Sequence, residues 1–175
     1  MLSGKILQGR LGAHFFIAGK LEDEFEFQIP LIHALQDRLH PEALVICDFG
    51  PGTGISVSVG LSKMNIAVII LQPAADWERN LTAMLDMTGK INIPAGLILN
   101  KVNDDMLYVS EVKAFCSEHS IPLLGILPSD EGLDLKADCH EADGSGALDR
   151  SLMEIWEGFP GVHAEPGHIK KETFI

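Results

Sequence analysis

The sequence predicts an α/β fold in three layers, with a mostly parallel sheet covered by helices on both faces. Four short runs rich in Val, Ile and Leu do not alternate with polar residues, which is typical of strands buried on both faces. They cover residues 43–49, 66–72, 95–101 and 123–128. Segments of helical length join successive runs, and this order is that of βαβ units with right-handed crossovers.

Three helices are predicted between these runs, at residues 54–64, 76–91 and 106–120. In the second, apolar or small side chains recur at helical spacing at Trp77, Leu81, Met84, Leu85 and Thr88. In the third, the same spacing relates Val109, Val112, Phe115 and Cys116. Each helix is therefore expected to turn one face toward the sheet.

The two ends of the chain have weaker patterns. Residues 4–20 alternate loosely between glycines, which predicts one or two strands, forming a hairpin, and residues 29–40 predict a helix with Pro30 in its first turn. Residues 147–157 predict a last amphipathic helix, after a loop that follows residue 128. One α/β domain is expected over 1–157, comprising an N-terminal part at 1–40 and a core at 43–136, with a tail at 158–175.

Composition excludes several classes of protein. The formal net charge of −12 over 175 residues argues against nucleic-acid binding and against docking on anionic membranes. No apolar run approaches the roughly 20 residues of a membrane span, and the N-terminus lacks the features of a signal peptide. The three cysteines include no C-x-x-C pair, which favours a reducing compartment, so a cytoplasmic protein is expected.

A metal site at Cys139 and His140 is a weaker interpretation. The two residues are adjacent and are flanked by Asp138 and Glu141. Adjacent residues rarely provide two ligands to one zinc ion, and no partner pair has the spacing of a zinc site. We therefore predict no metal-ligating residues in the chain itself.

Polar and glycine residues follow the first predicted strand, at the sheet edge where open α/β folds bind ligands. Asp48 ends the strand, and an acid at this place can hold Mg²⁺ through water. Glycines allow the backbone to approach a phosphate and direct its N–H groups at it, while proline stiffens the turn and threonine adds a hydroxyl. The candidate phosphate-binding residues are Gly50, Pro51, Gly52, Thr53 and Gly54.

Further candidates follow the later strands. The third strand ends in Asn100 and Lys101, and an asparagine amide has the donors and acceptor that suit the edge of a purine base. The fourth strand ends in Pro128. Each feature also has a plain structural interpretation, because Asp48 and Asn100 could simply cap local backbone. Their succession at strand ends favours a nucleotide site.

These motifs carry a resemblance to a known family. "VICDFGPGTG" resembles the switch-II segment of the MinD/ParA-like (SIMIBI class) P-loop ATPases, and "IAVIILQPAADWERNLTAMLDM" resembles their next strand and helix. "IPAGLILNKVNDD" is similar to their base-recognition strand, and "IPLLGILPSDEGL" to the strand that closes over the base. "GRLGAHFFIAGKL" is similar to the stretch that follows the insert in the subfamily with an inserted ferredoxin domain.

The resemblance implies a P-loop NTPase-like fold that binds ATP or ADP with Mg²⁺. It implies that Asp48 is the Mg²⁺-linked catalytic residue and that the turn at 50–54 binds the phosphates. It also implies that Asn100, Lys101 and Pro128 contact the base. It does not extend to the family's K-G-G-x-G-K-[ST] loop, because the Gly-Lys pairs at 4–5, 19–20 and 89–90 lack its context. The ferredoxin cysteines are missing too, so the match is to an N-terminally truncated fold with no intrinsic iron–sulfur cluster.

Three functions are consistent with this pattern. The chain could be a non-catalytic or accessory subunit of an ATPase or iron–sulfur-linked complex. It could be the C-terminal half of a split ATPase whose P-loop comes from another chain. It could also be an α/β protein-interaction domain with a relic nucleotide site. A second protein chain is the expected partner, either in a homodimer or as a P-loop- and ferredoxin-bearing ATPase, and the chain is not expected to be an ATPase on its own.

Overall fold

The computed structural model describes residues 4–12, 14–21, 28–40, 43–103, 106–129 and 146–159. The chain divides into two compact units, residues 1–64 and 65–175, and each is described by itself. The single domain expected over 1–157 stays a prediction. The metal interpretation at Cys139 and His140 and nearly all of the predicted loop and tail lie outside the described residues.

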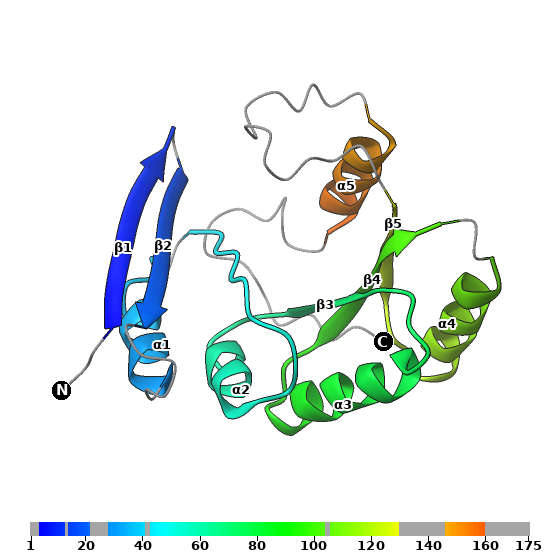
Figure 1. Ribbon diagram of the computed structural model, residues 1–175, viewed down its shortest axis with the longest axis horizontal. Helices are drawn as coiled ribbons and strands as arrows, with labels where there is room; N and C mark the ends of the chain where they lie inside the picture. Colours follow the sequence, from blue (N-terminus) through cyan, green and yellow to red (C-terminus); the bar gives the residue numbers. More distant parts are fainter. Residues whose placement is uncertain are drawn as a thin grey trace. The chain divides into compact units, whose positions relative to one another are not determined.

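The first unit contains the predicted N-terminal hairpin. Strands β1 (Gly4–Leu11) and β2 (His14–Leu21) pair antiparallel (Figure 1). Helix α1 (Gln28–Gln36) packs on β2, where a Cβ added to Gly19 would lie 2.9 Å from a methyl of Leu31. Close packing of helix on hairpin therefore requires glycine at this position. The helix predicted over 29–40 ends early, at Gln36, and i→i−3 hydrogen bonds tighten the turn that follows.

Residues 43–49 do not form the strand that their composition predicts. The segment has no ladder partner among the described residues, and Leu44 and Ile46 are 57% and 78% exposed. Its intervening side chains are half-buried, so the segment alternates as an extended chain does when one face is covered. The prediction of a strand was wrong because apolar, β-branched composition favours extended backbone, whereas a strand also needs a hydrogen-bonding neighbour.

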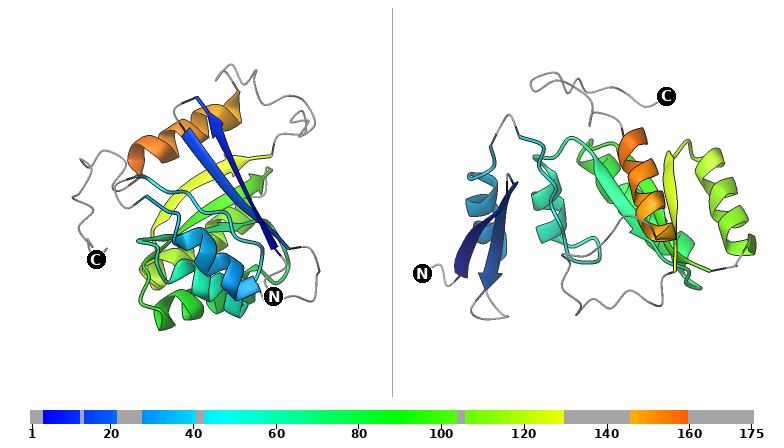
Figure 2. Two further views of the ribbon diagram at one scale, coloured as in Figure 1. Left: turned by 90° about the vertical axis from the view of Figure 1, so that its left-hand side faces the viewer. Right: turned by 90° about the horizontal axis from the view of Figure 1, so that it is seen from above.

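The second unit contains the predicted parallel sheet. Its strands are β3 (Ala67–Leu71), β4 (Ala95–Val102) and β5 (Leu123–Pro128), hydrogen-bonded in the order β3-β4-β5. Helices α3 (Trp77–Lys90) and α4 (Met106–Glu118) make the crossovers. Helix α5 (Ala147–Gly158) packs on β5, and Figures 1 and 2 show it across the sheet from α3 and α4. The predicted α/β class with helices on both faces is confirmed.

The core of this unit lies between the sheet and the helices α3 and α4. It comprises the buried residues Ile69, Leu71, Leu81, Leu97, Leu99, Tyr108, Val109, Val112 and Cys116. The helix faces predicted from spacing are confirmed, and Tyr108 is an addition to them. The Trp77 ring meets the rings of Tyr108 and Phe115 edge-on, at centroid distances of 6.1 and 5.6 Å. Such contacts fix the angle at which α3 and α4 pack.

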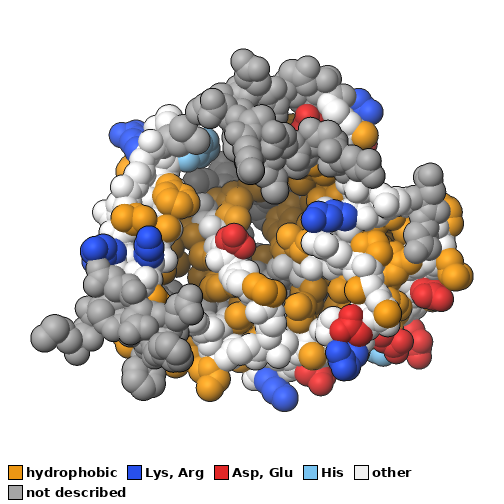
Figure 3. All heavy atoms as spheres, in the orientation of Figure 1, with side chains coloured by type: hydrophobic (Ala, Val, Ile, Leu, Met, Phe, Trp, Pro, Cys, Tyr) orange, Lys and Arg blue, Asp and Glu red, His pale blue; other side chains and the backbone are white. Residues whose placement is uncertain are grey.

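Strand β3 is exposed on one face, contrary to the burial predicted for all four runs. Ala67, Ile69 and Leu71 are buried, whereas Val68 and Ile70 are 39% and 56% exposed. Central strand β4 is buried on both faces from Gly96 to Leu99, as predicted. The difference follows from position, because β3 has one hydrogen-bonding neighbour in the described sheet, and α5, the described helix on the second face, packs on β5. Apolar side chains, orange in Figure 3, are correspondingly common on the surface.

Candidate functional site

The glycine turn, residues 50–54, connects the extended segment to helix α2 (Ile55–Leu61), a shorter helix than the predicted 54–64. All five residues are exposed. Gly52 has φ +102°, a conformation that L side chains rarely adopt, and no atom lies within 4 Å of a Cβ built on Gly50 or Gly52. The turn therefore has the backbone freedom and the open space that close approach of a ligand requires.

Asp48 lies just before this turn. Its side chain is exposed, and it makes no hydrogen bond or ion pair with the part of the chain that the structure describes. The neighbouring Cys47 is half-buried, and burial raises the pKa of its thiol. A raised pKa keeps the thiol protonated and weakly nucleophilic at neutral pH. Of these two neighbours, Asp48 is the group available to an external ligand.

Asn100 and Lys101 form an irregularity at the carboxyl end of β4. The backbone N–H of Lys101 donates to Asn100 Oδ1 at 2.9 Å, and Lys101 has φ +56°. The register with β5 shifts between Leu99 and Val102, so the ladder is interrupted at this pair. Interruptions of this kind re-aim side chains at the rims of sheets. The Asn100 amide nitrogen has no partner among the described residues, so it can donate to a ligand.

The left-handed backbone of Lys101 leads to a prediction about stability. We expect Lys101→Gly to raise the free energy of unfolding by about 1 kcal/mol, because a left-handed conformation costs an L residue roughly 1–2 kcal/mol and glycine little. Urea unfolding followed by tryptophan fluorescence measures this, since Trp77 and Trp156 both belong to this unit. A Lys113→Gly control, at an exposed position inside α4, should instead lower the free energy of unfolding by about 1 kcal/mol.

Pro128 lies beside this irregularity. It is in register with Val102, and the backbone N–H of Ser129 donates to Val102 O at 3.0 Å. The second unit therefore brings Asn100, Lys101 and Pro128 to one edge of its sheet, the carboxyl edge. The other predicted residues, Asp48 and 50–54, belong to the first unit. A site that uses both sets stays a prediction.

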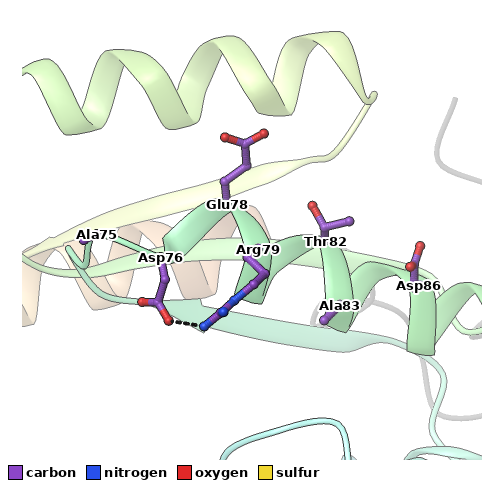
Figure 4. Close-up of a pocket in the computed structure, with 7 residues that line it drawn as sticks. All are labelled: Ala75, Asp76, Glu78, Arg79, Thr82, Ala83 and Asp86. Atoms are coloured by element: carbon purple, nitrogen blue, oxygen red, sulfur yellow. Dashed lines mark hydrogen bonds and ion pairs between the residues drawn. The ribbon is translucent and has the colours of Figure 1, made fainter.

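A surface hollow on α3 was not predicted from the sequence. It has a volume of about 510 Å³, is open to solvent and is lined by Ala75, Asp76, Glu78, Arg79, Thr82, Ala83 and Asp86. Figure 4 shows Asp76 and Arg79 turned toward each other, and their ion pair measures 2.9 Å. A hydrogen bond from Asn80, with a smaller contribution from Arg79, lowers the pKa of Asp76. The i,i+3 spacing of acid and base was the signal available in the sequence.

This hollow does not have the character of a ligand site. Its lining comes from one helix and the turn before it, and its side chains are mostly polar and solvated. Ligand sites are usually concave, mostly apolar and built from several elements. The strand ends therefore remain the better candidates.

The described residues include neither a cluster of metal-binding side chains nor a membrane-spanning helix. No group of three or more His, Cys, Asp and Glu side chains there is arranged to hold a metal ion. None of the helices described above has the length and apolarity needed to cross a membrane.

Comparison with known proteins gives a likeness in fold. No protein-family model matches the chain, and no curated protein matches its sequence. A solved structure of a protein described as a plasmid partition protein of Borrelia burgdorferi B31, bound to AMPPNP, superposes with a TM-score of 0.55 at 15% sequence identity. The match covers 79% of this chain and 56% of that one, so the chain spans little more than half of the solved protein. The chain therefore has the P-loop NTPase-like α/β fold of that structure.

Proposed function

We propose that the chain is a nucleotide-binding protein of MinD/ParA-like fold. The observation that carries the proposal is the carboxyl edge of the sheet, where Asn100, Lys101 and Pro128 lie together at the ends of β4 and β5. Ligands of open α/β sheets bind at this edge. The AMPPNP in the solved plasmid partition protein supports a nucleotide as the ligand.

Each candidate residue has a role in this proposal that its chemistry allows. Asn100 donates from its amide to the base, and Pro128 gives the base an apolar wall. The N–H groups of the turn at 50–54 face the phosphates, and Gly52 permits the backbone conformation they need. Asp48 holds Mg²⁺ through water, as an acid that follows an apolar segment does in nucleoside triphosphatases.

We further propose that the chain works with a second polypeptide. No lysine-bearing glycine loop accompanies the turn at 50–54, and such a loop supplies much of the charge stabilisation in phosphoryl transfer. A homodimer, or a P-loop- and ferredoxin-bearing ATPase to which this chain is an accessory or a split half, would provide it. One edge of β3 has no hydrogen-bonding neighbour among the described strands, which is consistent with pairing to another strand. ATP or ADP with Mg²⁺ is the cofactor, and no iron–sulfur cluster is assigned to this chain.

The test is calorimetric titration of the chain with ATP and with ADP. We expect micromolar binding with Mg²⁺, which Asp48→Asn weakens about tenfold, because a carboxylate contact to bound Mg²⁺ and its water is charge-assisted. With EDTA in place of Mg²⁺, wild type and Asp48→Asn should bind equally. Asp86→Asn, at an exposed acid of α3, is the matched control and should change nothing.

Two results would count against the proposal. Equal loss of affinity in Asp48→Asn with and without Mg²⁺ would remove the metal-linked role of Asp48. Lack of binding by the chain, alone and with its natural partner, would leave the interaction domain with a relic nucleotide site as the function.

A further inference from the structure

Helix α2, which follows the glycine turn, is weak by composition. Its sequence, ISVSVGL, contains three β-branched residues, two serines and a glycine. These residues have low helix propensity, and an isolated helix of this length is not stable in water. Its N-cap, Gly54, provides no side-chain hydrogen bond. The order of α2 therefore depends on contacts with other parts of its unit.

One of these contacts completes the hydrogen bonding at the end of α2. The carbonyls of Ser58, Val59 and Leu61 accept hydrogen bonds from backbone N–H groups three or four residues further along the chain. The carbonyl of Gly60 instead accepts from Gln36 Nε2, at 3.0 Å, and the same nitrogen also donates to Val59 O, at 3.1 Å. We call these two hydrogen bonds the Gln36 clamp. A side chain of α1 thus satisfies a carbonyl that α2 leaves open.

The chemistry of the clamp requires an amide. Gln36 is the last residue of α1 and is 8% exposed. Two carbonyl oxygens can be bonded only by a donor, so the NH₂ group faces α2 and fixes the orientation of the amide. Its Oε1 is buried without a partner among the described residues, which costs part of what the two bonds contribute. The exposed ion pair Lys63–Asp37, at 3.4 Å, links the same two helix ends.

The glycine turn is tied to the same point of α2 from its other side. Phe49 precedes the turn, and its ring occupies the space beside Gly60, where an added Cβ would lie 2.1 Å from Phe49 Cε1. At Gly60, the Phe49 ring packs beside the Cα atom, and the Gln36 amide donates a hydrogen bond to the carbonyl oxygen. The contact of Phe49 with Gly60 closes the segment that contains the turn at 50–54, and the Gln36 clamp holds the α2 side of that contact.

We propose that Gln36 is a positioning residue for the glycine turn. By holding the end of α2 it fixes Gly60, and by way of Gly60 it fixes Phe49. It therefore positions the turn at 50–54, which carries the candidate phosphate-binding N–H groups and lies between Phe49 and α2, and it positions Asp48, the neighbour of Phe49. The proposal rests on the proposed function for its ligand, but the clamp itself is defined by contacts within one unit.

The experiment compares Gln36→Met, which keeps the length of the side chain and removes its donors, with Gln28→Met, the same change at an exposed position of α1. Hydrogen–deuterium exchange of the full chain without ligand is the first measurement. We expect α2 amides to exchange about 10- to 100-fold faster in Gln36→Met, from the loss of two hydrogen bonds, and unchanged in Gln28→Met. The affinity for Mg²⁺-ATP is the second, and it should fall at least about tenfold only in Gln36→Met. Gln36→Lys, which keeps donors, should restore both in part and serves if Gln36→Met does not fold.

The two measurements separate the possible failures. Unchanged exchange of α2 would overturn the clamp. Faster exchange with unchanged affinity would show a structural contact and overturn the positioning role. If wild type binds no nucleotide, the proposed function fails, and the positioning role fails with it, whereas exchange still decides whether the clamp exists.

Discussion

Leu99→Ala is expected to lower the free energy of unfolding of the second unit by about 2–5 kcal/mol. Leu99 is completely buried in β4, the central strand of the described sheet, where it packs with residues of α3 and α4. Removing its side chain loses the transfer energy of the buried methyl groups and leaves a cavity that neighbours from three elements cannot fill together.

Urea unfolding followed by tryptophan fluorescence measures this change, since Trp77 packs at the border of the same core. Leu107→Ala is the matched control, because Leu107 lies in α4 and is 70% exposed. It should change stability by no more than about 0.5 kcal/mol. Equal losses in the two variants would contradict the burial on which the fold of this unit depends.

Sequence patterns predicted the strands and helices of the second unit well, because the order of apolar and polar residues in each element reflects which of its side chains are buried. A strand that is apolar on both faces, as residues 95–99 are, must be covered on both faces, and β4 is buried in this way from Gly96 to Leu99. Helical spacing of apolar residues selects one face of α3, and the residues so selected pack against the core. Each pattern reflects burial and lies within a single segment, so it can be recognised without knowing which segments pack beside it.

The predictions were wrong where the pairing or burial of a segment depends on the other segments that pack beside it. The runs at 43–49 and 66–72 have the composition of β4, but one is unpaired and the other is exposed on one face. Pairing is a property of two segments, and no count of apolar residues in one segment contains it. For the same reason Gln36 could not be selected, since a glutamine near a helix end acquires its role only from the carbonyls that α2 brings to it.

For the candidate site, the sequence predicted which polar residues follow the strands, but it did not predict their backbone conformation or hydrogen bonds. The sequence identified Asn100 and Lys101 as polar residues after a buried strand. It did not predict that the Lys101 backbone would be left-handed or that Asn100 Oδ1 would accept from it. Both lie at the register shift against β5, whose residues pair with those of β4 across 26 or 27 positions of sequence. The roles of Asp48, 50–54, Asn100, Lys101 and Pro128 therefore stay predictions that binding measurements must test.

Gly60→Ala is expected to destabilise the first unit by about 1–3 kcal/mol, although alanine favours helices over glycine by about 1 kcal/mol. The added methyl would enter the space of the Phe49 ring, and its nearest approach, 2.1 Å, requires the ring to leave. Gly89→Ala, in α3, is the matched control: no atom lies within 4 Å of the added methyl, so only the helix preference acts and stability should rise.

A double-mutant cycle distinguishes this clash from a general intolerance of α2. Phe49→Ala alone loses the packing of the ring on α2, and Gly60→Ala alone displaces the ring, so the two changes remove one contact twice. Their combined cost should therefore be less than the sum by about 1 kcal/mol or more. Both tryptophans lie in the second unit, so hydrogen exchange of residues 55–61 is the appropriate measurement. Additive costs would mean that Phe49 does not hold the glycine turn to α2, and that the base of the turn is open.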